Sequence, residues 1–171
     1  METLNAIFVG GSLTQSAWQV GGKNSAHVGR INADSAQWVW QKQFLEPGDA
    51  MHSITALSIN PAGTKLACYG WENPLVNLGA TDGFIFILDP GSGATASGMM
   101  KLTFSTPGYQ VKSHGFKITA DGSVFMAFNH LSTSTLSPEQ MSLLGKWSST
   151  ANTMIMKRSA GSLYGVSASL A

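Results

Sequence analysis

The residues of this chain that could bind or react are scattered aromatic, acidic and histidine side chains. Zinc needs convergent ligands that often lie close together in the sequence. The three histidines among the candidates are far apart and have no His-x-His pair or cysteine beside them, so we expect no metal site and no cofactor. Aromatic rings on loops could instead stack on a sugar. The candidate ligand- or partner-binding residues are Trp18, Asp49, His52, Trp71, Glu72, Tyr109, His114 and His130.

No constellation of residues in the sequence matches a familiar catalytic site. We find no nucleophile elbow, phosphate-binding glycine loop, EF-hand-like loop or suitably spaced carboxylate pair. Four aspartates fall at expected turns or strand starts, where Asp side chains accept hydrogen bonds from local backbone: Asp34, Asp82, Asp89 and Asp121. The single cysteine, Cys68, lies in the apolar segment LACY and is interpreted as a small core residue. We predict no catalytic residues.

Composition excludes several classes of function. The chain has 171 residues, of which 43% are hydrophobic and only 11% charged, against roughly 25% in a typical domain. A formal net charge of +1 gives no broad field that would attract nucleic acid. No segment approaches the roughly 20 apolar residues of a membrane helix, so we expect no membrane insertion. The N-terminal METLNAIFVGGS lacks the features of a signal peptide. The low charge nevertheless favours an extracellular or cell-surface location.

An internal repeat predicts the elements that would position the candidate residues. The segment INPAGTKLACYG (59–70) resembles ITADGSVFMAFN (118–129), and the two are 59 residues apart. This alignment places Leu66 opposite Phe125 and, working backwards, AIFVGG (6–11) opposite LACYGW (66–71). Each segment reads as an apolar run, a tight turn and a second apolar run, which is typical of a β-hairpin. The turns suit a three-residue hairpin loop in which Gly63 and Gly122 have positive φ.

Apolar runs and turns extend the repeat to a unit of four short strands. Three units follow one another, and the first lacks its first strand, which predicts eleven strands in the order three, four and four. One short loop helix is expected at 137–147, because Ser137 could cap it and Pro138 suits its first turn. The connections at 12–26, 71–82 and 131–151 are long, as are LEPGDAMHS (45–53) and STPGYQVKSHG (105–115), and all of them fall at one end of the units. Binding residues gather on such loops, so we expect the candidate residues to lie there.

Four-stranded units that repeat at this spacing predict an all-β, β-propeller-like fold with about three antiparallel blades, the first incomplete. The blades would cover residues 5–44, 53–104 and 112–170 of one partial propeller domain. Packing of each blade on two neighbours explains why FIFIL (84–88) is apolar at every position. A β-sandwich is the alternative, although it does not explain why tight turns and long loops recur in register.

The repeat resembles the bacterial β-propeller repeat family abbreviated SBBP. The matching segments are IFVGGS, HVGRINADSAQWVWQKQF, ITALSINPAGTKLACYG, ATDGFIFILDPGSG and FKITADGSVFMAF, and TDGF (81–84) is the closest. The resemblance covers about 130 of the 171 residues and departs most in the third unit. It implies a propeller of the kind common in large extracellular or surface proteins, and it brings no catalytic residues.

Three blades are too few to close a ring of the usual 4 to 8. An open arc would expose apolar faces at both ends, so we expect a second copy, another protein chain or a longer form of this chain to complete it. The sequence therefore favours a non-catalytic module that serves as a binding or structural subunit of a homo- or hetero-oligomer. A lectin-like domain that binds carbohydrate, or a hydrolytic domain, with its site on the long loops is the alternative.

Overall fold

The structure is a computed structural model of the chain, and it describes residues 5–13, 25–44, 51–72, 82–102, 109–132, 140–148, 150–151 and 153–158. These residues form β-strands joined by turns, with no helix among them, which confirms an all-β chain for the described part. The strands are β1 (Ala6–Leu13), β2 (Ser25–Asn32), β3 (Trp38–Phe44), β4 (Met51–Ile59), β5 (Leu66–Glu72), β6 (Asp82–Leu88), β7 (Met100–Leu102), β8 (Tyr109–Ile118), β9 (Ser123–Ser132), β10 (Gln140–Ser148) and β11 (Thr153–Arg158).

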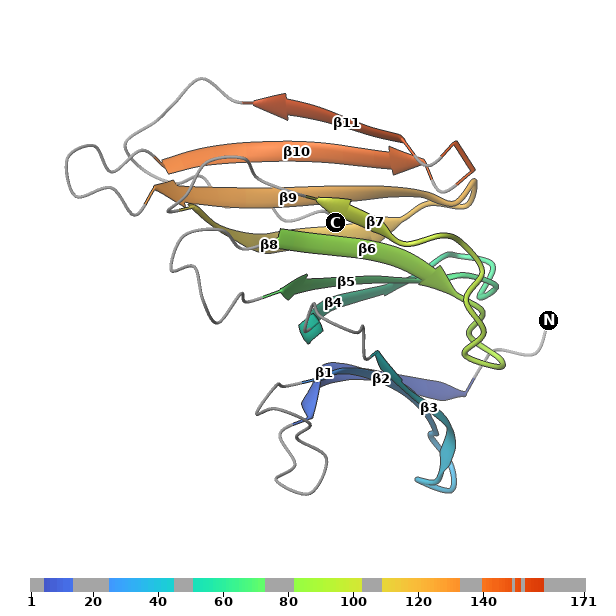
Figure 1. The fold of residues 1–171 in the computed structure, drawn as a ribbon. Helices are drawn as coiled ribbons and strands as arrows, with labels where there is room; N and C mark the ends of the chain where they lie inside the picture. Colours follow the sequence, from blue (N-terminus) through green and yellow to red (C-terminus); the bar gives the residue numbers. More distant parts are fainter. Residues whose placement is uncertain are drawn as a thin grey trace.

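The described strands form three antiparallel sheets, each of which follows the chain as a meander. Sheet I has the order β1-β2-β3, sheet II the order β4-β5-β6-β7, and sheet III the order β8-β9-β10-β11. Sheets I and II therefore have the three and four strands predicted for the first two units, whereas the four strands of sheet III differ from those predicted for the third. None of the three sheets closes on itself. In Figure 1 sheet II lies between sheet I and sheet III, so the described part of the molecule is a stack of three layers.

The predicted helix at 137–147 is wrong wherever the structure describes it. Residues 140–148 form β10, which pairs with β9 on one edge and β11 on the other. This strand also buries Trp147, and such pairing and packing outweigh a local preference for helix. Ser137 and Pro138 of the predicted helix lie outside the described residues. The expected loop at 131–151 consequently contains a strand, and β11 takes fourth place in sheet III rather than third. The fourth strand predicted at 162–170 lies outside the described residues.

Glycines occupy the positive-φ position of the two turns that the repeat identified, as predicted. Gly63 has φ 68° and Gly122 has φ 86°, in the left-handed region that other residues avoid. The turn between β8 and β9 has the expected three-residue loop. Its Thr119 N–H donates to the Ser123 carbonyl at 2.9 Å, and the Gly122 N–H donates to the Thr119 carbonyl at 3.0 Å.

The turn between β4 and β5 is one residue longer than predicted. The Asn60 N–H donates to the Lys65 carbonyl at 3.0 Å, so residues 61–64 form the loop. The Asn60 side chain stabilises the extra residue, because its Oδ1 accepts hydrogen bonds from the N–H groups of Thr64 at 2.8 Å and Lys65 at 2.9 Å.

The extra turn residue changes which side chains are equivalent in sheets II and III. Ile59 pairs with Leu66 across one turn, and Ile118 pairs with Val124 across the other. The counterpart of Leu66 is therefore Val124 and not Phe125, which corrects the sequence alignment. Successive strand residues point to opposite faces, so this shift of one residue exchanges the two faces of the strand.

Sheets I and II share a second kind of turn, at 32–37 between β2 and β3 and at 89–94 after β6. In the first turn the Asn32 N–H donates to the Gln37 carbonyl at 2.9 Å, and the Ala36 N–H donates to the Asn32 carbonyl at 2.9 Å. In the second turn the Asp89 N–H donates to the Ala94 carbonyl at 2.8 Å, and the Gly93 N–H donates to the Asp89 carbonyl at 2.8 Å. The fifth residue is left-handed in each case: Ala36 with φ 55° and Gly93 with φ 72°. The two turns are therefore structural counterparts.

Alignment through these turns also corrects the match between AIFVGG and LACYGW. Gly11 pairs with His27, and Gly70 pairs with Phe84, the residue that holds the same place relative to the turn. Gly11 is thus the counterpart of Gly70, whereas the sequence alignment placed Gly10 there. By the same register Ile7 corresponds to Leu66.

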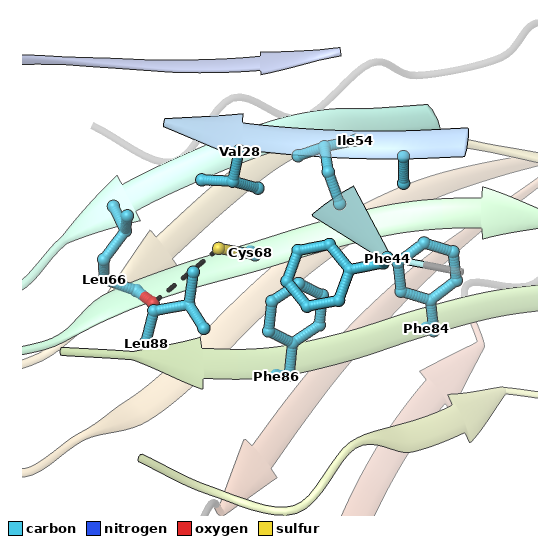
Figure 2. Packing of buried hydrophobic residues seen from close by; sticks show 9 residues of the cluster. Val28, Phe44, Ile54, Leu66, Cys68, Phe84, Phe86 and Leu88 are labelled. Atoms are coloured by element: carbon cyan, nitrogen blue, oxygen red, sulfur yellow. Dashed lines mark hydrogen bonds between the residues drawn. The ribbon is translucent and has the colours of Figure 1, made fainter. Parts of the chain in front are cut away.

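Both faces of sheet II are buried, each against a different sheet. Leu66, Cys68 and the rings of Phe84 and Phe86 pack on sheet I, where Figure 2 shows Phe44 against both rings. The alternate residues on β5 and β6 pack on sheet III in a second cluster: Ala67, Tyr69, Ile85 and Ile87. Every residue of FIFIL is 3% exposed or less, as expected for a strand packed on two sides.

Candidate functional site: the uncovered faces of the end sheets

The structure places most of the predicted binding residues in strands and not in loops. Trp18 and Asp49 lie outside the described residues. The other six are in strands at positions where the sequence predicted loops, because β4, β5, β8 and β9 extend further than their apolar runs. These six are His52 in β4, Trp71 and Glu72 in β5, Tyr109 and His114 in β8, and His130 in β9.

Strand register brings five of the six residues together in two groups. Ser53 pairs with Trp71 and Met51 with Glu72, so His52, Trp71 and Glu72 share one end of sheet II. Tyr109 opens β8 opposite Ser132, and Val111 pairs with His130, so Tyr109 and His130 share the corresponding end of sheet III.

Two of the three histidines, His52 and His114, occupy irregular positions in their strands, and His114 belongs to neither group. Register shifts between Met51 and Ser53 and between Ser113 and Gly115 leave His52 and His114 as extra residues at bulges. Bulges re-aim side chains and are frequent beside functional sites. Among the described residues, no three His, Cys, Asp or Glu side chains gather in a way that could hold a metal ion.

Two of the four turn aspartates accept hydrogen bonds from local backbone as predicted. Asp89 Oδ1 accepts from the Ser92 N–H at 2.7 Å and from its hydroxyl at 2.8 Å, and these bonds lower the carboxyl pKa. Asp121 accepts from the Thr119 hydroxyl and from the Ser123 N–H at 3.0 Å, which lowers its pKa to about 2.

Of the other two aspartates, Asp34 differs from that prediction and Asp82 has a side chain that the structure does not describe. At the turn after β2, Asn32 is the acceptor: its Oδ1 binds the N–H groups of Asp34 at 2.9 Å and Ser35 at 3.0 Å. The Asp34 carboxylate accepts instead from the Asn5 side-chain amide. Asp82 is the first residue of β6, and the structure does not describe its side chain.

Cys68 is a core residue, as predicted. Its side chain is fully buried between sheets I and II, and the thiol donates to the Leu66 carbonyl at 3.9 Å (Figure 2). Burial raises the pKa of the thiol far above its usual range, which keeps it protonated and unreactive.

The most distinctive surface in the described structure is the outer face of sheet I. Strand alternation places Ile7, Val9 and Gly11 on this face, and Ile7 is 52% exposed. A Cβ added to Gly11 would meet no atom within 4 Å, which shows that the face is open at this point. In each sheet we call the face that corresponds to the Leu66 and Cys68 face of sheet II the rear face; in sheet II this face packs on sheet I. The outer face of sheet I is therefore its rear face. The sequence predicted that an end face would be exposed but did not identify its residues.

An indole covers the middle of the rear face of sheet I. Trp38 lies over Gly29, where a Cβ would collide with the ring, and its ring meets His27 edge-on at 5.8 Å between centroids. Trp38 is still 45% exposed, and the buried His27 Nε2 has no hydrogen-bond partner in the described structure. The rear face therefore offers a broad apolar and aromatic surface with no charged side chain among the residues named here.

We call the opposite face of each sheet its front face; in sheet II the front face packs on sheet III. The front face of sheet III is the outer surface at the other end of the stack. Phe125 and Ala127 on β9 lie on it, because their neighbours Val124 and Met126 point into the core. Phe125 is half-buried and Ala127 is buried, so the exposed part of this face is formed by lysines. Two exposed lysines flank Phe125 in adjacent strands: Lys117 on β8 and Lys146 on β10. The Lys146 ammonium lies 5.4 Å from the centre of the Phe125 ring.

These two faces can bind another surface by burial of apolar groups and by contacts between lysines and aromatic rings. Within the described residues, no helix is long and apolar enough to cross a membrane. Comparisons with family models, with curated proteins and with solved structures found no match to this chain. The resemblance to the SBBP repeat stays a prediction.

Proposed function

We propose that this chain is a non-catalytic β-propeller module that serves as a binding or structural subunit of a larger assembly. Three meandering sheets that pack face to face in chain order support the proposal, because stacked four-stranded sheets are the building units of propellers. The proposal extends to an extracellular or cell-surface location and to a relationship with SBBP repeats.

The observation that carries the proposal is the contrast between counterpart residues in sheets I and II. Leu66 and Cys68 are 1% and 0% exposed, because sheet I covers them, whereas their counterparts Ile7 and Val9 are 52% and 38% exposed. Large exposed apolar patches on a soluble protein mark interaction sites. A chain that leaves this kind of face uncovered is suited to association.

Native mass spectrometry of the protein purified from its source would test this function, together with light scattering of the purified chain. We expect a stable complex with a second copy or with a co-purifying protein. A monomer that is soluble at every concentration, with no partner at stoichiometric amounts, would contradict the proposal.

A lectin-like or hydrolytic domain is the second candidate, and strand register favours it by bringing His52, Trp71 and Glu72 to one end of sheet II. Aromatic rings can stack on sugars. A glycan array and a panel of hydrolase substrates would test it. Reproducible turnover that is lost in Glu72→Gln or His114→Ala would replace the structural proposal by this one.

A further inference from the structure

We propose that the rear face of sheet I docks onto the front face of sheet III of a second copy of this chain. The inference rests on the proposed function and names its partner and its surfaces. The two faces involved are the outer surfaces of the two end sheets, and each has a counterpart that is buried inside the chain.

Head-to-tail stacking is used twice within one chain. The front face of sheet I packs on the rear face of sheet II, and the front face of sheet II packs on the rear face of sheet III. A third contact of the same kind joins the two free faces, and these two faces belong to different ends of the stack. A second copy supplies the missing face in both directions, so the contact continues an arrangement that already exists.

Counterpart residues show what the docked face would cover. In sheet II, Leu66 and Cys68 are fully buried, because sheet I covers them. In sheet I, their counterparts Ile7 and Val9 are exposed, and a Cβ added to Gly11 on the same face would meet no atom within 4 Å. The rear face of sheet I is therefore the face of sheet II without its cover.

The turn at 32–37 gives a second, independent indication. Sheet I buries two residues of the counterpart turn at 89–94, Pro90 and Gly93: the Trp40 indole N–H donates to the Pro90 carbonyl at 3.1 Å, and Lys42 Nζ donates to the Thr95 hydroxyl at 2.7 Å and to the Gly93 carbonyl at 3.4 Å. In sheet I the turn has the same backbone hydrogen bonds, yet the corresponding residues Ala33 and Ala36 are exposed.

Charge on the front face of sheet III suits that uncovered turn. Its two exposed lysines, Lys117 and Lys146, can reach carbonyl groups of the turn, as Lys42 does within the chain, and the exposed Asp34 carboxylate lies in the same turn. The exposed Trp38 ring on the same sheet offers a cation–π partner to a lysine. The lysines of the front face of sheet III therefore complement the carbonyl groups and the Asp34 carboxylate of the turn at 32–37 and the Trp38 ring beside it.

Gly11→Arg should block the proposed contact and leave the fold intact, because an added Cβ at Gly11 has no atom of its own chain within 4 Å. Gly98→Arg is the matched control: Gly98 also has no atom within 4 Å of an added Cβ, and it lies in the segment before β7, away from both faces. Sedimentation velocity should show an associating wild type and control. Gly11→Arg should weaken association by about tenfold or more, and circular dichroism should be unchanged.

Mixing variants tests whether two different faces meet. The double variant Lys117→Glu/Lys146→Glu alters the front face of sheet III and should also associate poorly. Mixed with Gly11→Arg, it retains one intact pair of faces, so the mixture should recover association. A contact between two copies of the same face gives no recovery, and that result would overturn the proposal.

The remaining outcomes separate the inference from the proposed function. Association of the wild type that Gly11→Arg leaves intact would overturn the docking surface and leave the assembly function standing. A complex that forms only with a different protein would overturn the second copy as partner. A wild type that is monomeric and binds no partner would overturn the inference and the proposed function together.

Discussion

The two counterpart turns predict opposite effects of exchanging alanine and glycine. Ala36 and Gly93 both have a left-handed backbone at the fifth position of the same turn. We expect Ala36→Gly to stabilise the chain and Gly93→Ala to destabilise it. The pair tests whether the turns are equivalent, because each substitution makes one turn resemble the other.

The magnitudes follow from backbone strain and from one contact. A left-handed alanine costs about 1–2 kcal/mol, and glycine loses about 0.5–1 kcal/mol through its greater freedom in the unfolded chain, so Ala36→Gly should gain about 0.5–1 kcal/mol. Gly93→Ala adds a collision, since its Cβ would lie 2.8 Å from Cδ2 and Cε3 of Trp40. The ring cannot move away without weakening its hydrogen bond to Pro90, which is worth about 1 kcal/mol. The total cost should be about 2–3 kcal/mol.

Thermal unfolding followed by circular dichroism, at one fixed protein concentration, would measure both effects. At this chain length 1 kcal/mol shifts Tm by about 2–4 °C, so Gly93→Ala should lower Tm by roughly 5–10 °C and Ala36→Gly should raise it by a few degrees. A fixed concentration is needed because association itself changes Tm. Equal and small effects of both substitutions would refute the assignment of the turns and of Trp40.

Three further predictions concern the core and its titrating groups. Phe44→Ala should cost about 3–5 kcal/mol in denaturant unfolding, because Phe44 packs 4.7 Å from Phe86 between ring centres, whereas Ala at the exposed Gln41 should change stability by under about 0.5 kcal/mol. Cys68 should react with a thiol reagent at pH 8 only after unfolding, and labelling of the native chain as fast as that of a free thiol would contradict its burial. Asp121, with its pKa lowered to about 2, should stabilise the fold above about pH 4, and this contribution should be lost as the pH falls from about 4 to about 2. Asp121→Asn should remove that part of the acid transition, and an unchanged pH profile would show that its hydrogen bonds do not persist in solution.

Apolar runs and glycine turns were sufficient to predict the strand order of sheets I and II, but not that of sheet III. A strand that is apolar at every position, such as FIFIL, indicates burial on both faces, and the structure shows this burial. Gly63 and Gly122 could be predicted because a tight turn requires positive φ and glycine adopts it without strain. The prediction of a helix in the region of β10 was wrong. Glu139, Gln140 and Leu143 are good helix formers, but pairing with β9, which the local sequence does not show, makes this segment a strand.

Which face each residue occupies could not be read from the repeat alone. One added turn residue, Thr64, moves Phe125 from the rear face to the front face of its sheet, and glycine-based alignment hides the change. The binding candidates were selected for lying in long loops, but loop boundaries depend on how far strands extend by pairing. Ile7, Val9 and Trp38 were missed because their residue types are those of a core, and only the stacking order shows that nothing described covers them.

The two end faces differ in a way that separates folding from association. At the front face of sheet II, Ile87 is 1% exposed against sheet III, and its counterpart at the front face of sheet III is Lys146. A lysine at the centre of a sheet contact must extend its ammonium to the rim to stay hydrated, which limits how closely the faces approach. The contact between copies should therefore be weaker than either contact within the chain. The three layers would then fold as a unit before two copies meet, and weakening the docking surface would change the assembly without unfolding its subunits.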